Sequence, residues 1–180
     1  MATPPDFVAG QVLTAAQLNK GGLWLVSSTT VAAGASSHTV SSVFSADYDN
    51  YVVHFYGGAG STSAAINLTL GATATGYYYG LNTMSYAAAA GALGGANTTS
   101  FAFAGYMSTA GVFGTFTLFN PFASDETYIN VQMAYPTTTG FGVSGGGYLA
   151  NTTSYTAFTL TPASGTFGST RVLVYGVNNG

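Results

Sequence analysis

The residues of this sequence that could carry chemistry are few, and a glycine motif is the first of them. Residues 140–145, GFGVSG, have the G-x-G-x-x-G spacing of a dinucleotide-binding turn. That turn needs a following helix whose N-terminus holds the pyrophosphate, and an acidic residue about 20 positions further on for the ribose. Here Gly146, Gly147 and Tyr148 follow, and no acidic residue occurs after Glu126. The motif therefore predicts a glycine-rich strand or bulge, and no cofactor is expected.

The acidic side chains lie in short clusters. Asp47, Asp49 and Asn50 place three side-chain oxygens within four residues, but no bidentate glutamate or EF-hand spacing accompanies them. Asp and Asn also bond their own backbone, so a turn between strands is the simpler interpretation, as it is for Asp125 and Glu126. A glycosidase pair of Asp49 and Glu126 would require about 5 to 9.5 Å between the carboxylates in a cleft. We expect neither a catalytic nor a metal centre.

The two histidines do not add a clear site. His54 lies in an apolar run, where a hydrogen-bonded interior or interface histidine is the more frequent role. His38 is the only other imidazole, and a zinc site would need a third protein ligand. The residue types of a Ser-His-Asp set are present, but such a set is defined by its geometry. We expect that the chain is not an enzyme.

Tyrosines are the best candidates for ligand contact. Tyr77, Tyr79 and Tyr86, with Tyr78 in the same run, are the candidates for a contact surface, because tyrosine offers a large amphipathic area at low entropic cost. A host-surface glycan is the possible ligand of that surface. The alternative is that alternate tyrosines fill the core while the others pack across a subunit interface.

The composition excludes several kinds of partner. Seven of the 180 residues are formally charged, two basic and five acidic, which is 4% of the chain against about 25% in ordinary domains. With two basic residues and no basic run, nucleic acid is not an expected partner. There is no cysteine, so disulfides and thiolate ligands are absent. The longest run of small apolar residues, 86–96, is too short to span a bilayer, and we expect no membrane span.

The chain from residue 22 to residue 180 is expected to be one all-β domain. Short runs rich in β-branched and aromatic residues alternate with Gly, Ser, Asn and Thr clusters, which is typical of β-sandwiches and barrels. We predict a jelly-roll-like β-sandwich. The β pattern fails at 84–99, which we predict to be an ordered loop. The expected strands are 23–27, 38–44, 50–57, 65–71, 75–80, 100–107, 113–119, 127–135, 141–149, 154–160 and 170–176.

Two features predict a homo-oligomer. Residues 51–56, apart from His54, and residues 171–175 are apolar on both faces, as in strands that are covered on both sides. A chain with so little charge also lacks the repulsion that keeps free proteins apart. Another subunit would supply both the missing cover and colloidal stability.

Residues 1–21 are expected to form a separate anchoring arm that ends in a short α-helix. The two prolines favour an extended start, Thr14 and Gln17 have the spacing of a capping box, and Gly21 can end the helix. Because this helix is too short to be stable alone, its apolar residues need a larger host. The residues expected to dock onto a partner are Pro4, Pro5, Phe7, Val8, Val12, Leu13 and Leu18.

Residues 5–19, PDFVAGQVLTAAQLN, resemble the opening of many small tailed-bacteriophage virion proteins, variously called tail-fibre, minor tail or head-decoration proteins. Residues 154–176 are similar to the last two strands of the same group. The resemblance implies a virion protein that is assembled in the bacterial cytoplasm, contacts another capsid or tail component, forms a trimer and has no active site.

Three functions within that group remain open. The absence of a long shaft or repeat favours a capsid decoration or head-fibre protein. A tail-fibre or baseplate receptor-binding module is the alternative, with the tyrosines or residues 84–99 as its contact surface. A phage polysaccharide depolymerase is the third.

Overall fold

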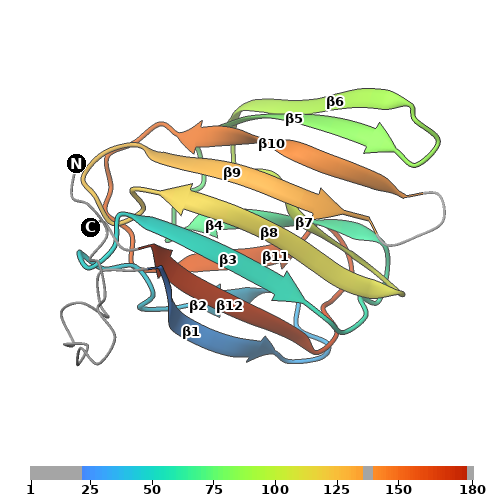
Figure 1. Cartoon of the computed structure of the whole chain (residues 1–180), viewed down its shortest axis with the longest axis horizontal. Coiled ribbons are helices and arrows are strands. Elements are labelled where there is room, and N and C mark those ends of the chain that lie inside the picture. The colour runs from blue at the N-terminus through green and yellow to red at the C-terminus, as the bar shows by residue number, and fades with distance from the viewer. Residues whose placement is uncertain (1–21, 136–139, 178–180) are drawn as a thin grey trace, which may run out of the picture.

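The computed structural model describes residues 22–135 and 140–177, and every regular element within them is a β-strand (Figure 1). The all-β prediction is therefore confirmed for this part of the chain. The expected arm and helix lie outside the described residues. The strands are β1 (Leu23–Val31), β2 (His38–Val40), β3 (Asn50–Tyr56), β4 (Ala64–Leu70), β5 (Tyr77–Ser85), β6 (Ala90–Thr98), β7 (Phe101–Ser108), β8 (Gly111–Phe119), β9 (Thr127–Ala134), β10 (Phe141–Leu149), β11 (Phe158–Pro162) and β12 (Thr170–Val177).

All strand pairs are antiparallel. One strand, β8, pairs with three others and joins the two layers described below. It pairs with β3 from Phe113 to Phe119 and with β9 from Thr115 to Phe119. It pairs with β7 only near the hairpin, where Ser108 faces Gly111. One path runs β1-β12-β3-β8-β9-β10-β5-β6 and forms a long layer. The strands β2-β11-β4-β7 form a shorter layer that lies behind it in Figure 1. We call the side of the long layer that faces away from the short layer the outer face.

The core between the layers follows from strand alternation. On β9, Ile129, Val131 and Met133 are buried, whereas Asn130 and Gln132 between them are exposed. Burying each large apolar side chain contributes about 1.5 to 3 kcal/mol. Both layers supply further buried side chains, including Tyr51, Val53, Phe55, Phe116, Leu118, Val172 and Val174 from the long layer and Ile66, Leu68, Leu70, Phe101, Phe158 and Leu160 from the short one.

Phe55 marks the place where the two layers meet. Its side chain is fully buried and packs against the Phe116 ring at 6.1 Å between centroids. The ring lies over two glycines, Gly105 on β7 and Gly114 on β8, and a Cβ added at either position would overlap it. The missing side chains therefore make the room that the ring occupies.

The ends of the described chain lie next to each other. Leu23, at the start of β1, pairs with Val177, at the end of β12, and the pairing continues to Val31 and Thr170 with one irregularity near Leu25. β1 has no hydrogen-bonded neighbour on its other side among the described residues. It is therefore an edge of the long layer, as β6 is at the opposite end.

The predicted loop at 84–99 is wrong. Most of it is β6, which pairs with β5 through a turn in which Ala88 has a φ of 63°. The segment has no β-branched residue before Thr98, but its ladder is made by backbone groups and does not need such residues. The predicted strand 38–44 is shorter than expected, since β2 ends at Val40, and the predicted strand 154–160 is displaced, since β11 runs from Phe158 to Pro162. Among the described residues no helix could cross a membrane.

Candidate functional site

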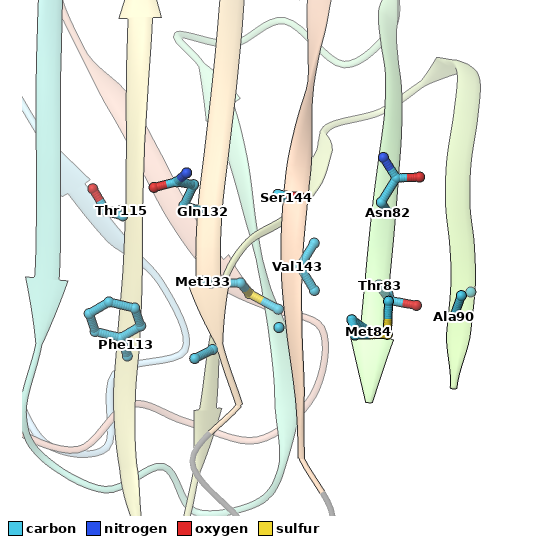
Figure 2. A pocket seen from close by; sticks show the side chains of 13 residues that line it. Asn82, Thr83, Met84, Ala90, Phe113, Thr115, Gln132, Met133, Val143 and Ser144 are labelled. Atoms are coloured by element: carbon cyan, nitrogen blue, oxygen red, sulfur yellow. The ribbon is translucent and has the colours of Figure 1, made fainter. Parts of the chain in front are cut away.

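A shallow hollow of about 640 Å³ opens on the outer face, across β8, β9, β10, β5 and β6 (Figure 2). Its floor is low because Ala134 and Gly142, which are direct cross-strand partners, carry almost no side chain. The remaining lining comes from Asn82, Thr83, Met84, Ala90, Gly91, Phe113, Thr115, Gln132, Met133, Val143 and Ser144.

Four uncharged polar side chains form one side of the hollow. Thr115, Gln132, Ser144 and Asn82 are successive cross-strand partners on β8, β9, β10 and β5, and we call them the polar row. Because neighbouring strands lie about 4.8 Å apart, the row is about 14 Å long. The Thr115 hydroxyl bonds His54 Nδ1 at 2.9 Å. The other three side chains are exposed and make no hydrogen bond to another described residue, so their donors and acceptors are open to a ligand.

Apolar side chains close the two ends of the hollow. Phe113 lies at one end and Met84 at the other, as Figure 2 shows. Phe113 is 41% exposed and Met84 is 53% exposed. No ring contact is seen for Phe113 within the described part of the chain. An unstacked aromatic surface beside a line of amides and hydroxyls is a lining of mixed polarity, typical of small-molecule sites.

Beyond the polar row lies a strip without side chains. Gly146, Gly80 and Gly94 are in line across β10, β5 and β6, and a Cβ at Gly80 would meet no atom within 4 Å. We call these residues the glycine strip. Because the glycine strip has no side chains, Ser144 and Asn82 of the polar row are not covered on the side that faces away from the hollow.

Three stacked tyrosines follow the glycine strip. Tyr78 and Tyr148 stack with ring centroids 5.1 Å apart, and Tyr128 stacks on Tyr148 at 6.1 Å. The Tyr128 hydroxyl donates to Glu126 Oε2 at 2.9 Å, and this bond, with the charge of the carboxylate, raises the pKa of Tyr128. We call Tyr128, Tyr148 and Tyr78 the tyrosine row.

The outer face is almost without charge near the hollow, since no Asp, Glu, Lys or Arg lines it. Arg171 lies two strands from Phe113, where its guanidinium donates to Ser28 Oγ at 3.3 Å. His38 is on β2 of the short layer, where burial lowers its pKa. The surroundings of the hollow therefore suit an uncharged ligand.

Only part of the predicted tyrosine surface is exposed. Tyr77 is fully buried, and its hydroxyl accepts the Leu70 N–H at 2.9 Å and donates to the Thr73 carbonyl at 3.1 Å. Burial raises the pKa of Tyr77 to about 12. Tyr77 is therefore a core residue, and its expected role in ligand contact is wrong.

The other two predicted contact residues lie apart. Tyr79 is half-buried and packs against the cluster of Leu81, Met133 and Val143. Tyr86 is 56% exposed and donates to the Tyr135 carbonyl at 3.0 Å. Alternation on β5 places Tyr78, the middle residue of the predicted tyrosine run, on the outer face instead. Sequence reasoning missed Tyr128, Tyr148 and the polar row.

The acidic clusters lie in turns. Ser45 Oγ donates to Asp47 Oδ2 at 3.0 Å, the Asp49 carbonyl accepts the Asn120 N–H at 2.7 Å, and Asp125 Oδ1 accepts the Glu126 N–H at 2.8 Å. None of these side chains lines the hollow. Within residues 22–135 and 140–177, no group of three or more metal-binding side chains comes together.

The glycine motif at 140–145 lies largely in strand β10 and opens no helix. The overlapping residues 142–146, GVSGG, match the letters of a nucleophile elbow, G-x-S-x-G, but they stay paired with β5 and β9 throughout. Ser144 is three strands from His54, which is about 14 Å at the usual strand spacing. This serine and this histidine therefore cannot form a hydrogen-bonded pair.

The seven predicted docking residues, between Pro4 and Leu18, lie outside the described part of the chain. No protein-family model matches the sequence, and no curated protein matches it.

Proposed function

We propose that this chain is a non-enzymatic structural protein of a tailed-bacteriophage virion, most closely a capsid decoration or head-fibre protein. The bacteriophage origin rests on the resemblance of residues 5–19 and 154–176. The observation that supports a structural, assembling role is the exposure of large apolar side chains on a protein with almost no charge. At the start of β1, Leu23, Trp24, Leu25 and Val26 are all exposed, on both faces of an edge strand. Proteins that stay monomeric protect such edges with charges, prolines or bulges, and β1 has one irregularity between Leu25 and Ser27 but no charge and no proline.

The proposal also covers the type of fold and the oligomeric state of the protein. The two layers are the halves of a β-sandwich, jelly-roll-like, and the chain forms a homotrimer through the outer face of β12 and β3 and the edge β1. Leu173 and Tyr175 on this outer face are only half-buried within one chain, so a neighbouring subunit has apolar area left to cover. The segment from residue 3 to residue 20 docks the protein onto its capsid partner.

Two measurements test this function. Multi-angle light scattering of the purified chain is expected to give three times the chain mass, and a stable monomer at micromolar concentration would contradict the assembly. Antibody labelling of phage particles, viewed by electron microscopy, is expected to mark the capsid. Labelling at the tail tip would favour the alternative function.

The alternative is a tail-fibre or baseplate module that binds a host receptor. The hollow with its polar row is the observation that favours it, because an uncharged lining of mixed polarity suits a host-surface glycan. A polysaccharide depolymerase is the third candidate. It needs two carboxylates facing a cleft, and neither Asp49 nor Glu126 lines the hollow.

A further inference from the structure

We propose that the hollow on the outer face binds a neutral carbohydrate chain, which lies across the strands between Phe113 and Met84. The proposal gives the receptor-binding alternative a defined site, but it does not depend on where in a virion the protein is located. The volume of about 640 Å³ falls within the range of about 300 to 1,000 Å³ that is usual for small-ligand sites.

The polar row selects hydroxyl groups. The amides of Gln132 and Asn82 each present donors and an acceptor, and Ser144 between them can do both, so each side chain can match a sugar hydroxyl that also donates and accepts. The row is about 14 Å long, which is a line of several contacts rather than a single point. This length fits an oligosaccharide better than a single small metabolite.

The absence of charge in the lining decides between neutral and acidic ligands. A carboxylate or sulfate in the hollow would lose part of its hydration and would meet no cationic lining residue. Arg171 does not line the hollow, since Tyr56 on β3 separates its strand position from that of Phe113 on β8. A neutral sugar pays no such electrostatic cost.

The apolar ends match the other character of a sugar, its C–H surface. Phe113 offers an exposed ring beside the polar row, and Met84 faces it from the opposite end as an adaptable apolar contact. A second copy of this chain would have to form hydrogen bonds to the amides of Gln132 and Asn82 individually, or bury them without partners, which is unfavourable. The exposed, unpaired amides therefore favour a hydroxyl-rich ligand.

The test uses the isolated full chain and NMR titration with neutral hexasaccharides of glucose, galactose, mannose and N-acetylglucosamine. Because the hollow is open, binding to one chain is expected near about 1 mM, and presentation of several sites on one oligomer would raise the avidity. At least one hexasaccharide should bind saturably, with shifts confined to the hollow. If none binds below about 10 mM, the proposal is wrong.

Variants locate the site. Gln132→Ala and Phe113→Ala should each weaken binding about tenfold, because each removes one well-placed contact. Asn67→Ala, which removes the same type of side chain from the partly exposed side of β4 in the short layer, is the matched control and should leave binding unchanged. Equal binding by all three variants would contradict the proposal.

Two further outcomes would also overturn it. If a sulfated or uronic hexasaccharide binds more tightly than every neutral one, the ligand class is wrong. If Phe113→Ala dissociates the oligomer in light scattering, the hollow is covered by a second copy of the chain. Particle attachment is measured separately, so a failure of the virion function would not be mistaken for a failure of this site.

Discussion

Replacement of Gly114 by alanine tests the packing where the two layers meet. The added methyl group would overlap the Phe55 ring and would lie 2.8 Å from the Ala104 carbonyl oxygen. The ring could turn only by displacing its buried neighbours, and the carbonyl belongs to the backbone of β7, so neither obstacle moves easily. Overpacking by one methyl group costs about 1 to 3 kcal/mol, and the upper part of that range applies here.

Gly80→Ala is the matched control for this change. Gly80 is also in a strand of the long layer, but a Cβ there meets no atom within 4 Å. Both variants gain about 0.5 to 1 kcal/mol because alanine loses less backbone entropy than glycine on folding, and this gain cancels in the comparison. Gly114→Ala should therefore be about 2 to 3 kcal/mol less stable than Gly80→Ala.

Urea unfolding followed by circular dichroism, at one fixed protein concentration, measures the difference. In a Phe55→Leu background the cost of Gly114→Ala should fall, because the overlapping ring atoms are gone, and the double-mutant cycle should give a coupling of at least about 0.5 kcal/mol. Equal stability of Gly114→Ala and Gly80→Ala would refute the account of the joint between the layers. Additive effects of the two substitutions would exclude Phe55 as the cause.

Three other predictions concern a buried hydroxyl, a buried phenol and the N-terminal segment, the last of which is predicted from the sequence alone. Thr127→Val should stabilise the protein by about 1 to 2 kcal/mol, because the buried Thr127 hydroxyl has no hydrogen-bond partner among the described residues. No change in the urea midpoint would contradict this. Stability should fall between about pH 10 and 12, because burial raises the pKa of the Tyr77 phenol in the folded chain above its unfolded-state value. The contribution of Tyr77 to the free energy of unfolding is complete below the unfolded-state pKa and is lost as pH rises through the folded-state pKa. Tyr77→Phe should flatten this loss in melting curves while it lowers stability at neutral pH. A chain that begins at Gly21 should fold and form oligomers but should not attach to particles; full attachment would move the docking surface into the β domain, and failure to fold would make residues 1–20 part of the core.

Much of the fold could be predicted from side-chain alternation. Ile129, Val131 and Met133 repeat with the period of two that a half-buried strand requires, and the structure buries all three. β6 could not be predicted in this way, because its Ala and Gly residues give no periodic signal. Its place is decided by the exposed edge of β5, to which any extended segment can add backbone hydrogen bonds.

The candidate site was less accessible to sequence reasoning. A shift of one residue in the register of a strand exchanges the side chains on its two faces. Which of Tyr77, Tyr78 and Tyr79 is exposed therefore depends on the register, and a run of three tyrosines does not indicate it. The polar row joins Asn82 to Ser144 and Gln132, which are some 50 to 60 positions further along the chain, and only the pairing of β5, β10 and β9 brings them together.

The pairing of Leu23 with Val177 has a mechanical consequence. Because both ends of the described chain leave from the same end of one antiparallel pair, a force that pulls them apart would act on the β1–β12 ladder one residue pair at a time, as in opening a zipper. Such a geometry yields at low force, since each step breaks only one or two hydrogen bonds. If the pulling force acts on other parts of the protein, the hydrogen bonds between β1 and β12 are not broken one residue pair at a time. Attachment at one end of the described chain alone would therefore leave the β1–β12 ladder unloaded, whereas attachment at both ends would load it.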